Sequence, residues 1–295
     1  MTSALEFRAV DILFAPRGRR RAGARAIQQA LALLDARGTR AAIAASTGVV
    51  LGVAGASLAV AHGEISVLMG LSGSGKSTLL RAANGLNAVT RGQVLVADGE
   101  STVDIGVNCD PATLRRIRRQ RIAMVFQQFG LLPWRTVRDN VGFGLELRGD
   151  PPAQRREIID RQLELVGLSQ WADRYTSELS GGMQQRVGLA RAFATDADIL
   201  LMDEPFSALD PLIRRKLQDE LLALQERVRK TILFVSHDLD EALKLGDQVT
   251  IMEGGRIVQT GTGRDIVERP ANGYVAEFVE HVNPRTAIKG AALPV

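Results

Sequence analysis

Gly70-Leu71-Ser72-Gly73-Ser74-Gly75-Lys76-Ser77 is the stretch that decides the fold of this 295-residue chain. It fits the pattern G-x-x-x-x-G-K-[ST], in which glycines let backbone N–H groups curl around phosphate oxygens. The apolar run of residues 65–69 precedes it, and helix-forming residues follow it. A strand, a glycine-rich loop and a helix in this order predict a phosphate-binding loop, with the positive end of the helix facing the anion.

The side chains of this loop have separate predicted roles. We expect Lys76 to reach the β- and γ-phosphates of a nucleotide and the Ser77 hydroxyl to ligate Mg²⁺. The remaining predicted nucleotide contacts are Gly70, Ser72, Gly73, Ser74, Gly75 and Thr78.

Other apolar runs predict the sheet around this loop. Residues 122–126, 199–202 and 232–235 are short and continuously apolar, which is typical of strands buried in a parallel sheet with helices on both faces. Two further strands are expected at residues 5–14 and 53–60, separated by one inserted helix at about residues 24–37. Helices are also expected at residues 155–166, in an inserted lobe, and at residues 183–195.

The composition is that of a globular protein, with 45% hydrophobic and 24% charged residues. The basic stretches 17–25 and 115–121 are not interleaved with aromatics, so nucleic acid is not expected as a partner. The single cysteine, Cys109, cannot form an internal disulfide, and a cytosolic chain is expected. Residues 41–61 are uncharged and as long as a membrane span, but their small residues and alternating end favour a strand.

A pair of carboxylates ends one of the buried strands. Asp203 and Glu204 follow residues 199–202, and catalytic groups collect at the carboxyl edge of a parallel sheet. We expect Asp203 to hold Mg²⁺ and Glu204 to polarise an attacking water.

A second anion-binding turn lies at Leu179-Ser180-Gly181-Gly182-Met183, where a Ser-Gly-Gly turn opens a helix. One chain then has one phosphate loop and two phosphate sites. The simplest resolution is a head-to-tail homodimer, in which Ser180, Gly181 and Gly182 of each copy meet the nucleotide bound by the other.

Taken together, these segments resemble the ATPase subunits of ABC transporters. Residues 70–77, residues 179–183 and the pair Asp203-Glu204 look like the Walker A, signature and Walker B motifs, in the right order. The resemblance implies ATP and Mg²⁺ as ligands and an α/β fold of the P-loop NTPase (RecA-like) class. Such a fold has a mostly parallel sheet, an N-terminal antiparallel β subdomain and an inserted helical subdomain, here at about residues 128–182 of an ATPase domain spanning residues 1–282.

The resemblance also assigns roles to residues that carry little signal alone. Gln127 matches the glutamine that senses Mg²⁺ and the attacking water, and His237 matches the switch histidine near the γ-phosphate. Asp210 ends a segment, Ser207-Ala208-Leu209-Asp210, that matches the D-loop. Phe14 matches the aromatic residue that stacks on adenine, although an aromatic at a strand end is equally compatible with the core.

One branch of the family matches in more detail, the ATPases of glycine betaine, proline betaine and choline importers. The similarity rests on the inserted helix after Phe14, on Met183 after the signature glycines and on residues 207–214 and 236–242. It implies an integral membrane permease and an extracytoplasmic solute-binding protein as partners, and a peripheral position on the cytoplasmic face of the membrane. Within the lobe segment 127–141, Leu132 and Trp134 are compatible with a permease contact or with the lobe core.

Two other classes of ATP-binding protein fit the motifs less well. A soluble ABC-type ATPase without a permease is expected to carry two ATPase cores or a long coiled-coil insertion, and neither is evident. A kinase with a phosphate loop leaves residues 179–183 and the D-loop unexplained. Residues 283–295 form a short tail where this branch often carries CBS repeats, so we expect no steep activation of the ATPase by salt.

Overall fold

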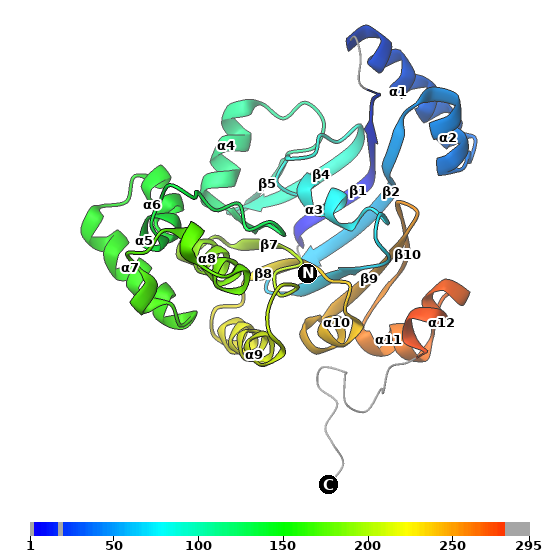
Figure 1. Ribbon diagram of the computed structural model, residues 1–295. Coiled ribbons are helices and arrows are strands. Elements are labelled where there is room, and N and C mark those ends of the chain that lie inside the picture. The colour runs from blue at the N-terminus through cyan, green and yellow to red at the C-terminus, as the bar shows by residue number, and fades with distance from the viewer. Residues whose placement is uncertain (1–2, 17–19, 281–295) are drawn as a thin grey trace.

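The computed structural model of the chain describes residues 3–16 and 20–280, which form two β-sheets surrounded by helices (Figure 1). The first sheet is antiparallel, and its strands run in the order β2 (Val50–Ala61), β1 (Ser3–Phe14), β4 (Arg91–Asp98) and β5 (Ser101–Asp104). The second runs in the order β10 (Arg256–Gly261), β9 (Gln248–Glu253), β3 (Ile65–Met69), β8 (Thr231–Val235), β7 (Ile199–Asp203) and β6 (Ile122–Val125). Only the β9–β10 pair of this second sheet is antiparallel.

The central strands of the second sheet are buried along their whole length. Every residue of β3, β7 and β8 is buried, so no polar alternation is needed, and apolar side chains cover both faces of the sheet. This is the arrangement that the continuous apolar runs predict. The predicted fold class, a mostly parallel sheet with an antiparallel β subdomain, is confirmed.

Helices cover the second sheet on both faces. Between the two sheets lie α3 (Lys76–Ala82) and α4 (Pro111–Gln120), which contribute Leu79, Leu80 and Ile117 to one apolar core. A second core lies on the opposite face, under α8 (Gly181–Ala194), α9 (Pro211–Val228), α10 (Leu239–Leu245), α11 (Gly263–Glu268) and α12 (Gly273–Val279).

A separate group of helices projects from the end of the sheet at β6 and appears at the left of Figure 1. It consists of α5 (Val137–Val141), α6 (Phe143–Arg148), α7 (Pro152–Leu165) and the 3₁₀ turns η1 (Ser169–Trp171) and η2 (Thr176–Glu178). Helix α8 completes its core with Val187 and Ala190, while Leu189 and Ala192 of the same helix face the sheet. Helix α8 therefore belongs to both cores and links the helical group to the sheet.

The segment between β1 and β2 contains two helices where the sequence predicts one. They are α1 (Arg20–Asp35) and α2 (Arg40–Thr47). Thr39 caps the start of α2 by accepting a hydrogen bond from the Ala42 N–H, and Gly48 ends it in the left-handed conformation. The uncharged stretch of residues 41–61 is thus part helix and part strand. No helix in residues 3–16 and 20–280 is long and apolar enough to cross a membrane.

Two sequence predictions lie outside the described residues. The tail of residues 283–295 is one, and residues 17–19 of the first basic stretch are the other.

The core of the helical group offers a test on a single short helix. Leu145 of α6 is fully buried, whereas Leu147, two residues along, is 48% exposed. Leu145→Ala should lower the free energy of unfolding by about 2–5 kcal/mol, because it removes buried methyl groups and leaves a cavity. Leu147→Ala, the matched control, should change it by less than about 0.5 kcal/mol. Urea unfolding checks both, and equal losses would contradict the observed packing.

Candidate nucleotide-binding site

The strand order brings the predicted site residues to one edge of the sheet. Strands β6, β7 and β8 are parallel neighbours, so their carboxyl ends lie side by side. Gln127 follows β6, the pair Asp203 and Glu204 ends β7, and His237 follows β8. Strand β3 lies on the other side of β8 and leads directly into the phosphate loop.

Two glycines of the phosphate loop occupy positions that exclude any side chain. A Cβ on Gly70, whose φ is +140°, would lie 2.1 Å from the Met252 carbonyl oxygen. A Cβ on Gly75, at φ +105°, would lie 2.6 Å from the Gly52 carbonyl oxygen. Both residues have backbone that only glycine adopts easily, and both let the loop approach neighbouring backbone closely.

Lys76 lies inside the loop. Its ammonium group donates hydrogen bonds to the carbonyl oxygens of Gly70, at 2.7 Å, and Leu71, at 3.0 Å. Burial lowers the pKa of Lys76, and the nearby carboxylates of Glu204 and Asp203 oppose that shift. A buried cation held by carbonyl oxygens is available to an incoming phosphate, which supplies the negative charge that the loop itself lacks.

Ser77 and Asp203 form a pair of oxygen ligands suited to Mg²⁺. The Ser77 hydroxyl donates to Asp203 at 2.7 Å, and Asp203 is fully buried and also paired with Arg81 at 3.0 Å. Mg²⁺ is usually held by one or two protein oxygens together with water and phosphate oxygens, so this small donor set fits the ion. The described residues contain no cluster of three or more His, Cys, Asp or Glu that would form a cage by itself. The Ser74 hydroxyl is also buried, and it has no hydrogen-bond partner among the described residues.

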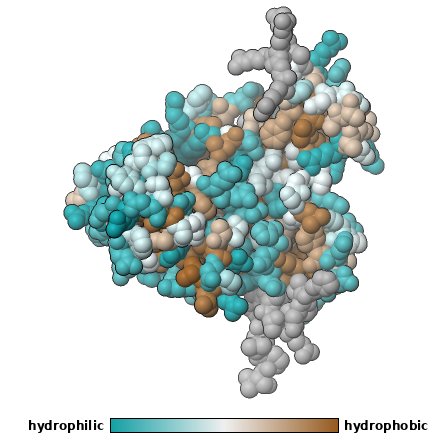
Figure 2. All heavy atoms as spheres, viewed as in Figure 1, coloured by the Kyte–Doolittle hydropathy of each residue, from teal (hydrophilic) through white to brown (hydrophobic). Residues whose placement is uncertain are grey.

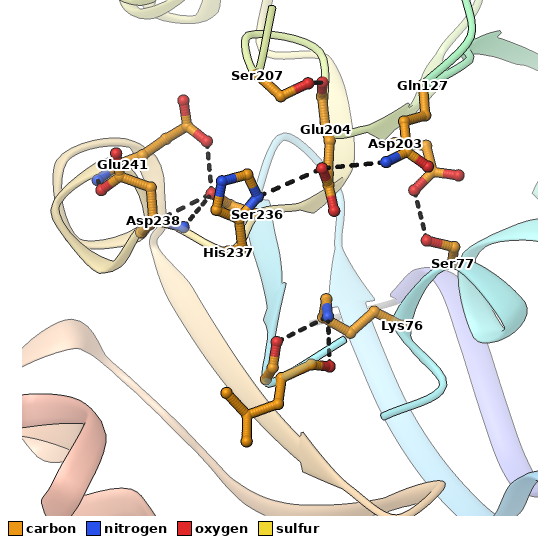
Figure 3. Close-up of polar contacts among 12 residues, drawn as sticks. Lys76, Ser77, Gln127, Asp203, Glu204, Ser207, Ser236, His237, Asp238 and Glu241 are labelled. Atoms are coloured by element: carbon orange, nitrogen blue, oxygen red, sulfur yellow. Dashed lines mark hydrogen bonds and ion pairs between the residues drawn. The ribbon is translucent and has the colours of Figure 1, made fainter. Parts of the chain in front are cut away.

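Glu204 stands at the centre of the site, between Gln127 and His237 (Figure 3). One carboxylate oxygen accepts a hydrogen bond from the Gln127 amide at 3.2 Å and lies 3.3 Å from His237 Nδ1. Its backbone has a positive φ of 49°, which is unusual for a non-glycine residue and marks a site where neighbouring structure imposes the conformation. Three loops from three adjacent strands therefore meet on one carboxylate.

Phe14 lies beside the start of α3. A Cβ placed on Gly52 would lie 2.8 Å from the Phe14 ring and 3.0 Å from the Thr78 methyl group, so both side chains approach the same glycine. Phe14 is 40% exposed, and so an aromatic face is available next to the phosphate loop. The sequence was compatible with either a core position or a surface position next to adenine for Phe14, and the side chain lies at the surface.

Ser180, Gly181, Gly182 and Asp210 are placed apart from this cluster. Ser180 caps α8, and no atom outside its neighbours lies within 4 Å of a Cβ built on Gly181. Asp210 caps α9 by accepting a hydrogen bond from the Leu212 N–H. Within the described part of the chain, no hydrogen bond joins these residues to the phosphate loop. Gly182 nevertheless lies near residues 208–209, since a Cβ built on it would be 3.5 Å from the Leu209 side chain and 3.6 Å from the Ala208 carbonyl oxygen.

The chain matches the ABC transporter family over residues 53–207. It belongs to that family. It is 56% identical over 237 residues to ProV, the glycine betaine/proline betaine transport system ATP-binding protein of Salmonella typhimurium, a match covering 80% of this chain and 58% of ProV. It is 49% identical over 255 residues to GbuA, the glycine betaine/carnitine transport ATP-binding protein of Listeria monocytogenes, covering 86% of this chain and 63% of GbuA. The chain thus spans less than two thirds of the length of these relatives.

A solved ABC structure has the same fold. It is the dimeric post-hydrolysis state of an ATP-binding cassette bound to ADP and Pi, with a TM-score of 0.72 and 28% identity, covering 88% of this chain and 99% of that one. This likeness supports the fold assignment independently of the motifs.

Several residues near the site carry no motif signal and were not predicted. Arg81 pairs with Asp203, and the Gln185 amide donates to the Glu204 carbonyl oxygen at 3.2 Å. Arg191 of α8 donates to the carbonyl oxygens of Phe129 and Gly130, which lie just after Gln127. The Tyr274 hydroxyl of α12 accepts from the Leu71 N–H. Helical spacing from Ser77 is the one signal that could have indicated Arg81.

A buried carboxyl supports the loop that carries His237. Glu241 of α10 accepts hydrogen bonds from the Ser236 hydroxyl and the Gln218 amide. Burial raises its pKa above the ordinary value of 4.5, and these two hydrogen bonds act in the opposite direction.

The raised pKa gives a prediction for stability against pH. The folded chain keeps a proton on Glu241 that the unfolded chain has released, so this residue makes the free energy of unfolding fall as pH rises from 4.5 through the raised pKa. Glu241→Gln removes that contribution. As pH rises through this window, the free energy of unfolding of the variant should therefore increase relative to that of wild type. Urea unfolding at a series of pH values measures the difference. An exposed control, Glu226→Gln, should track wild type, and a Glu241→Gln difference independent of pH would refute the prediction.

Proposed function

We propose that this chain is the ATP-binding and ATP-hydrolysing subunit of an ABC importer that drives uptake of a quaternary ammonium compatible solute, such as glycine betaine, proline betaine or choline. The observation that carries the proposal is the convergence of Lys76, Ser77, Asp203, Glu204 and His237 at one edge of a parallel sheet. Groups of these types, meeting around a phosphate loop, are those that phosphoryl transfer to water requires.

The residues of the site have separate roles in ATP hydrolysis. Lys76 and the backbone N–H groups of the loop bind the β- and γ-phosphates and offset their negative charge. Glu204 accepts a hydrogen bond from the attacking water and orients it toward the γ-phosphorus, and Gln127 and His237 hold the Glu204 carboxylate. Phe14 offers its exposed face to adenine. Mg²⁺, held by Ser77 and Asp203 with Gln127 nearby, would neutralise charge on the phosphate oxygens.

A homodimer accounts for the residues that this cluster leaves out. Ser180 and Gly181 are exposed at the start of α8, a helix of 14 residues whose first N–H groups suit an anion. Among the described residues no hydrogen bond joins them to the phosphate loop of their own chain, and this supports their meeting the nucleotide of a second copy. Ala208 and Leu209 of the D-loop lie next to Gly182, and Asp210 follows them at the start of α9.

The solute and the remaining partners are proposed from the relatives. The named transport systems of ProV and GbuA both include glycine betaine, and this supports an integral permease and an extracytoplasmic solute-binding protein as partners. The chain would then sit peripherally on the cytoplasmic face of the membrane. Trp134 is 70% exposed next to the loop that carries Gln127, so it can contact a permease, whereas Leu132 is half-buried.

Glu204→Gln tests the proposed catalytic role. The amide keeps the shape of the side chain but loses the charge that orients water, so hydrolysis should slow about a hundredfold or more while ATP binding persists. Phosphate release and equilibrium binding of labelled ATP measure the two effects. Glu226→Gln, an exposed change of the same kind on α9, should hydrolyse ATP at the wild-type rate. Wild-type turnover by Glu204→Gln would remove Glu204 from the mechanism.

Ser180→Arg tests the shared site. In a Glu204→Gln background the bulky side chain should leave ATP binding by each chain intact but prevent the ATP-dependent dimer, because it fills the space for the partner's γ-phosphate. Size-exclusion chromatography with and without ATP gives the result. Ser169→Arg adds the same group to another exposed serine of the helical group and should still dimerise. A dimer that forms equally well with Ser180→Arg would count against two shared nucleotide sites.

A further inference from the structure

The hairpin formed by α1 and α2 reaches the phosphate loop through one side chain. Arg40, the first residue of α2, donates a hydrogen bond from its guanidinium to the Gly73 carbonyl oxygen at 2.8 Å. Gly73 lies at the exposed tip of the loop, three residues before Lys76. No motif links residues 33 positions apart in this way, and the contact exists only because the hairpin is inserted between β1 and β2.

Backbone hydrogen bonds hold Ser74, the residue after Gly73, because its N–H donates to the Leu71 carbonyl and its carbonyl accepts from the Gly255 N–H. Gly73 has a positive φ of +78°, and no atom lies within 4 Å of a Cβ built there. Glycine in such a position samples many conformations, and this conformational entropy is lost when the loop closes around a phosphate. Tyr274 holds Leu71, at the start of the loop, and Lys76 is held at its end. Between them, Arg40 adds a side-chain hydrogen bond at Gly73 to the backbone hydrogen bonds of Ser74.

The hairpin is fixed firmly enough to act as a support. Ile43 of α2 and Ala30 of α1 are fully buried in an apolar cluster with Leu51 of β2. Arg91 of β4 also ties the hairpin to the sheet, because it binds Asp35 of α1 with two hydrogen bonds and Asp11 of β1 with a third. Arg40 therefore extends from a packed element, and its contact with Gly73 restrains the loop relative to the sheet.

The hairpin also stands next to Phe14. The strands on either side of the hairpin end at Phe14 and begin at Val50. These two residues pair across β1 and β2, and they are 40% and 51% exposed. Figure 2 shows an apolar area on the viewed face at the base of the hairpin. The hairpin is thus continuous with the proposed adenine face on one side and with the phosphate loop on the other.

We propose that Arg40 is a positioning residue of the nucleotide site, which holds the phosphate loop in its binding shape through the Gly73 carbonyl. The inference rests on the proposed function of the loop. A loop restrained before binding loses less conformational entropy on binding, so the effect appears in nucleotide affinity and not in the chemical step.

Arg40→Ala should raise the KM for MgATP and the Kd for labelled ATP by about five- to twentyfold, with kcat changed less than about twofold, because a hydrogen bond to a charged group is lost. Arg40→Lys should restore most of the affinity, because a lysine keeps the charge and one N–H donor for a single carbonyl. Arg25→Ala removes an exposed positive charge from the same hairpin and should leave KM unchanged.

Magnesium pyrophosphate as a competitor separates the phosphate loop from the adenine face. If Arg40 acts through the loop, Arg40→Ala weakens the binding of pyrophosphate and of ATP by the same factor. The urea midpoint of unfolding should stay unchanged. Weakened ATP binding with unchanged pyrophosphate binding would overturn the inference, as would a fall in kcat alone or a failure of Arg40→Lys to restore affinity. If the wild-type chain hydrolyses ATP and Arg40→Ala has the same KM and Kd as wild type, only this inference is overturned. If the wild-type chain binds neither ATP nor pyrophosphate, the proposed function is overturned.

Discussion

The site depends on one buried carboxylate. Asp203 is fully removed from solvent, and an ion in that position is tolerated only with hydrogen-bonding partners. The partners are Ser77 and Arg81, one turn apart on α3, so the carboxylate fixes the phosphate-loop helix against the end of β7. The adjacent residue, Glu204, is then held at the place where the loops after β6 and β8 arrive. These contacts place the phosphate-loop helix next to the groups proposed to act on its ligand.

The same arrangement suggests how events at the nucleotide reach the rest of the molecule. Helix α8 carries Ser180 at its start, donates through Gln185 to the Glu204 carbonyl, and donates through Arg191 to the backbone after Gln127. It also belongs to the cores of both the sheet and the helical group. A shift of Glu204 or Gln127 on nucleotide binding would therefore act on the helix proposed to meet a second copy. The packed contacts along α8 form a physical route for such coupling.

The sequence predicted those strands and loops that short stretches of residues determine by themselves. Continuous apolar runs gave β3, β6, β7 and β8, because strands buried on both faces need no alternation. The motifs placed Lys76 in the loop after one strand and Asp203 and Glu204 at the end of another, and parallel pairing explains why they meet. The second inserted helix, α2, was missed because its alanine-rich sequence carries no amphipathic pattern, and only Thr39 and Gly48 mark its ends. Arg40 and Tyr274 were missed for another reason, since their contacts with the loop depend on tertiary packing over large sequence separations.

The central claim is that two copies of this chain form the ATP-hydrolysing unit around their phosphate loops. The most direct measurement is the rate of ATP hydrolysis per chain as a function of protein concentration, with Mg²⁺ and saturating ATP. The account predicts that the rate per chain rises with concentration and then levels off, because each active site needs Ser180 to Gly182 of a second copy. A rate per chain that stays constant down to concentrations where light scattering finds only monomers would contradict it, as would the absence of any hydrolysis.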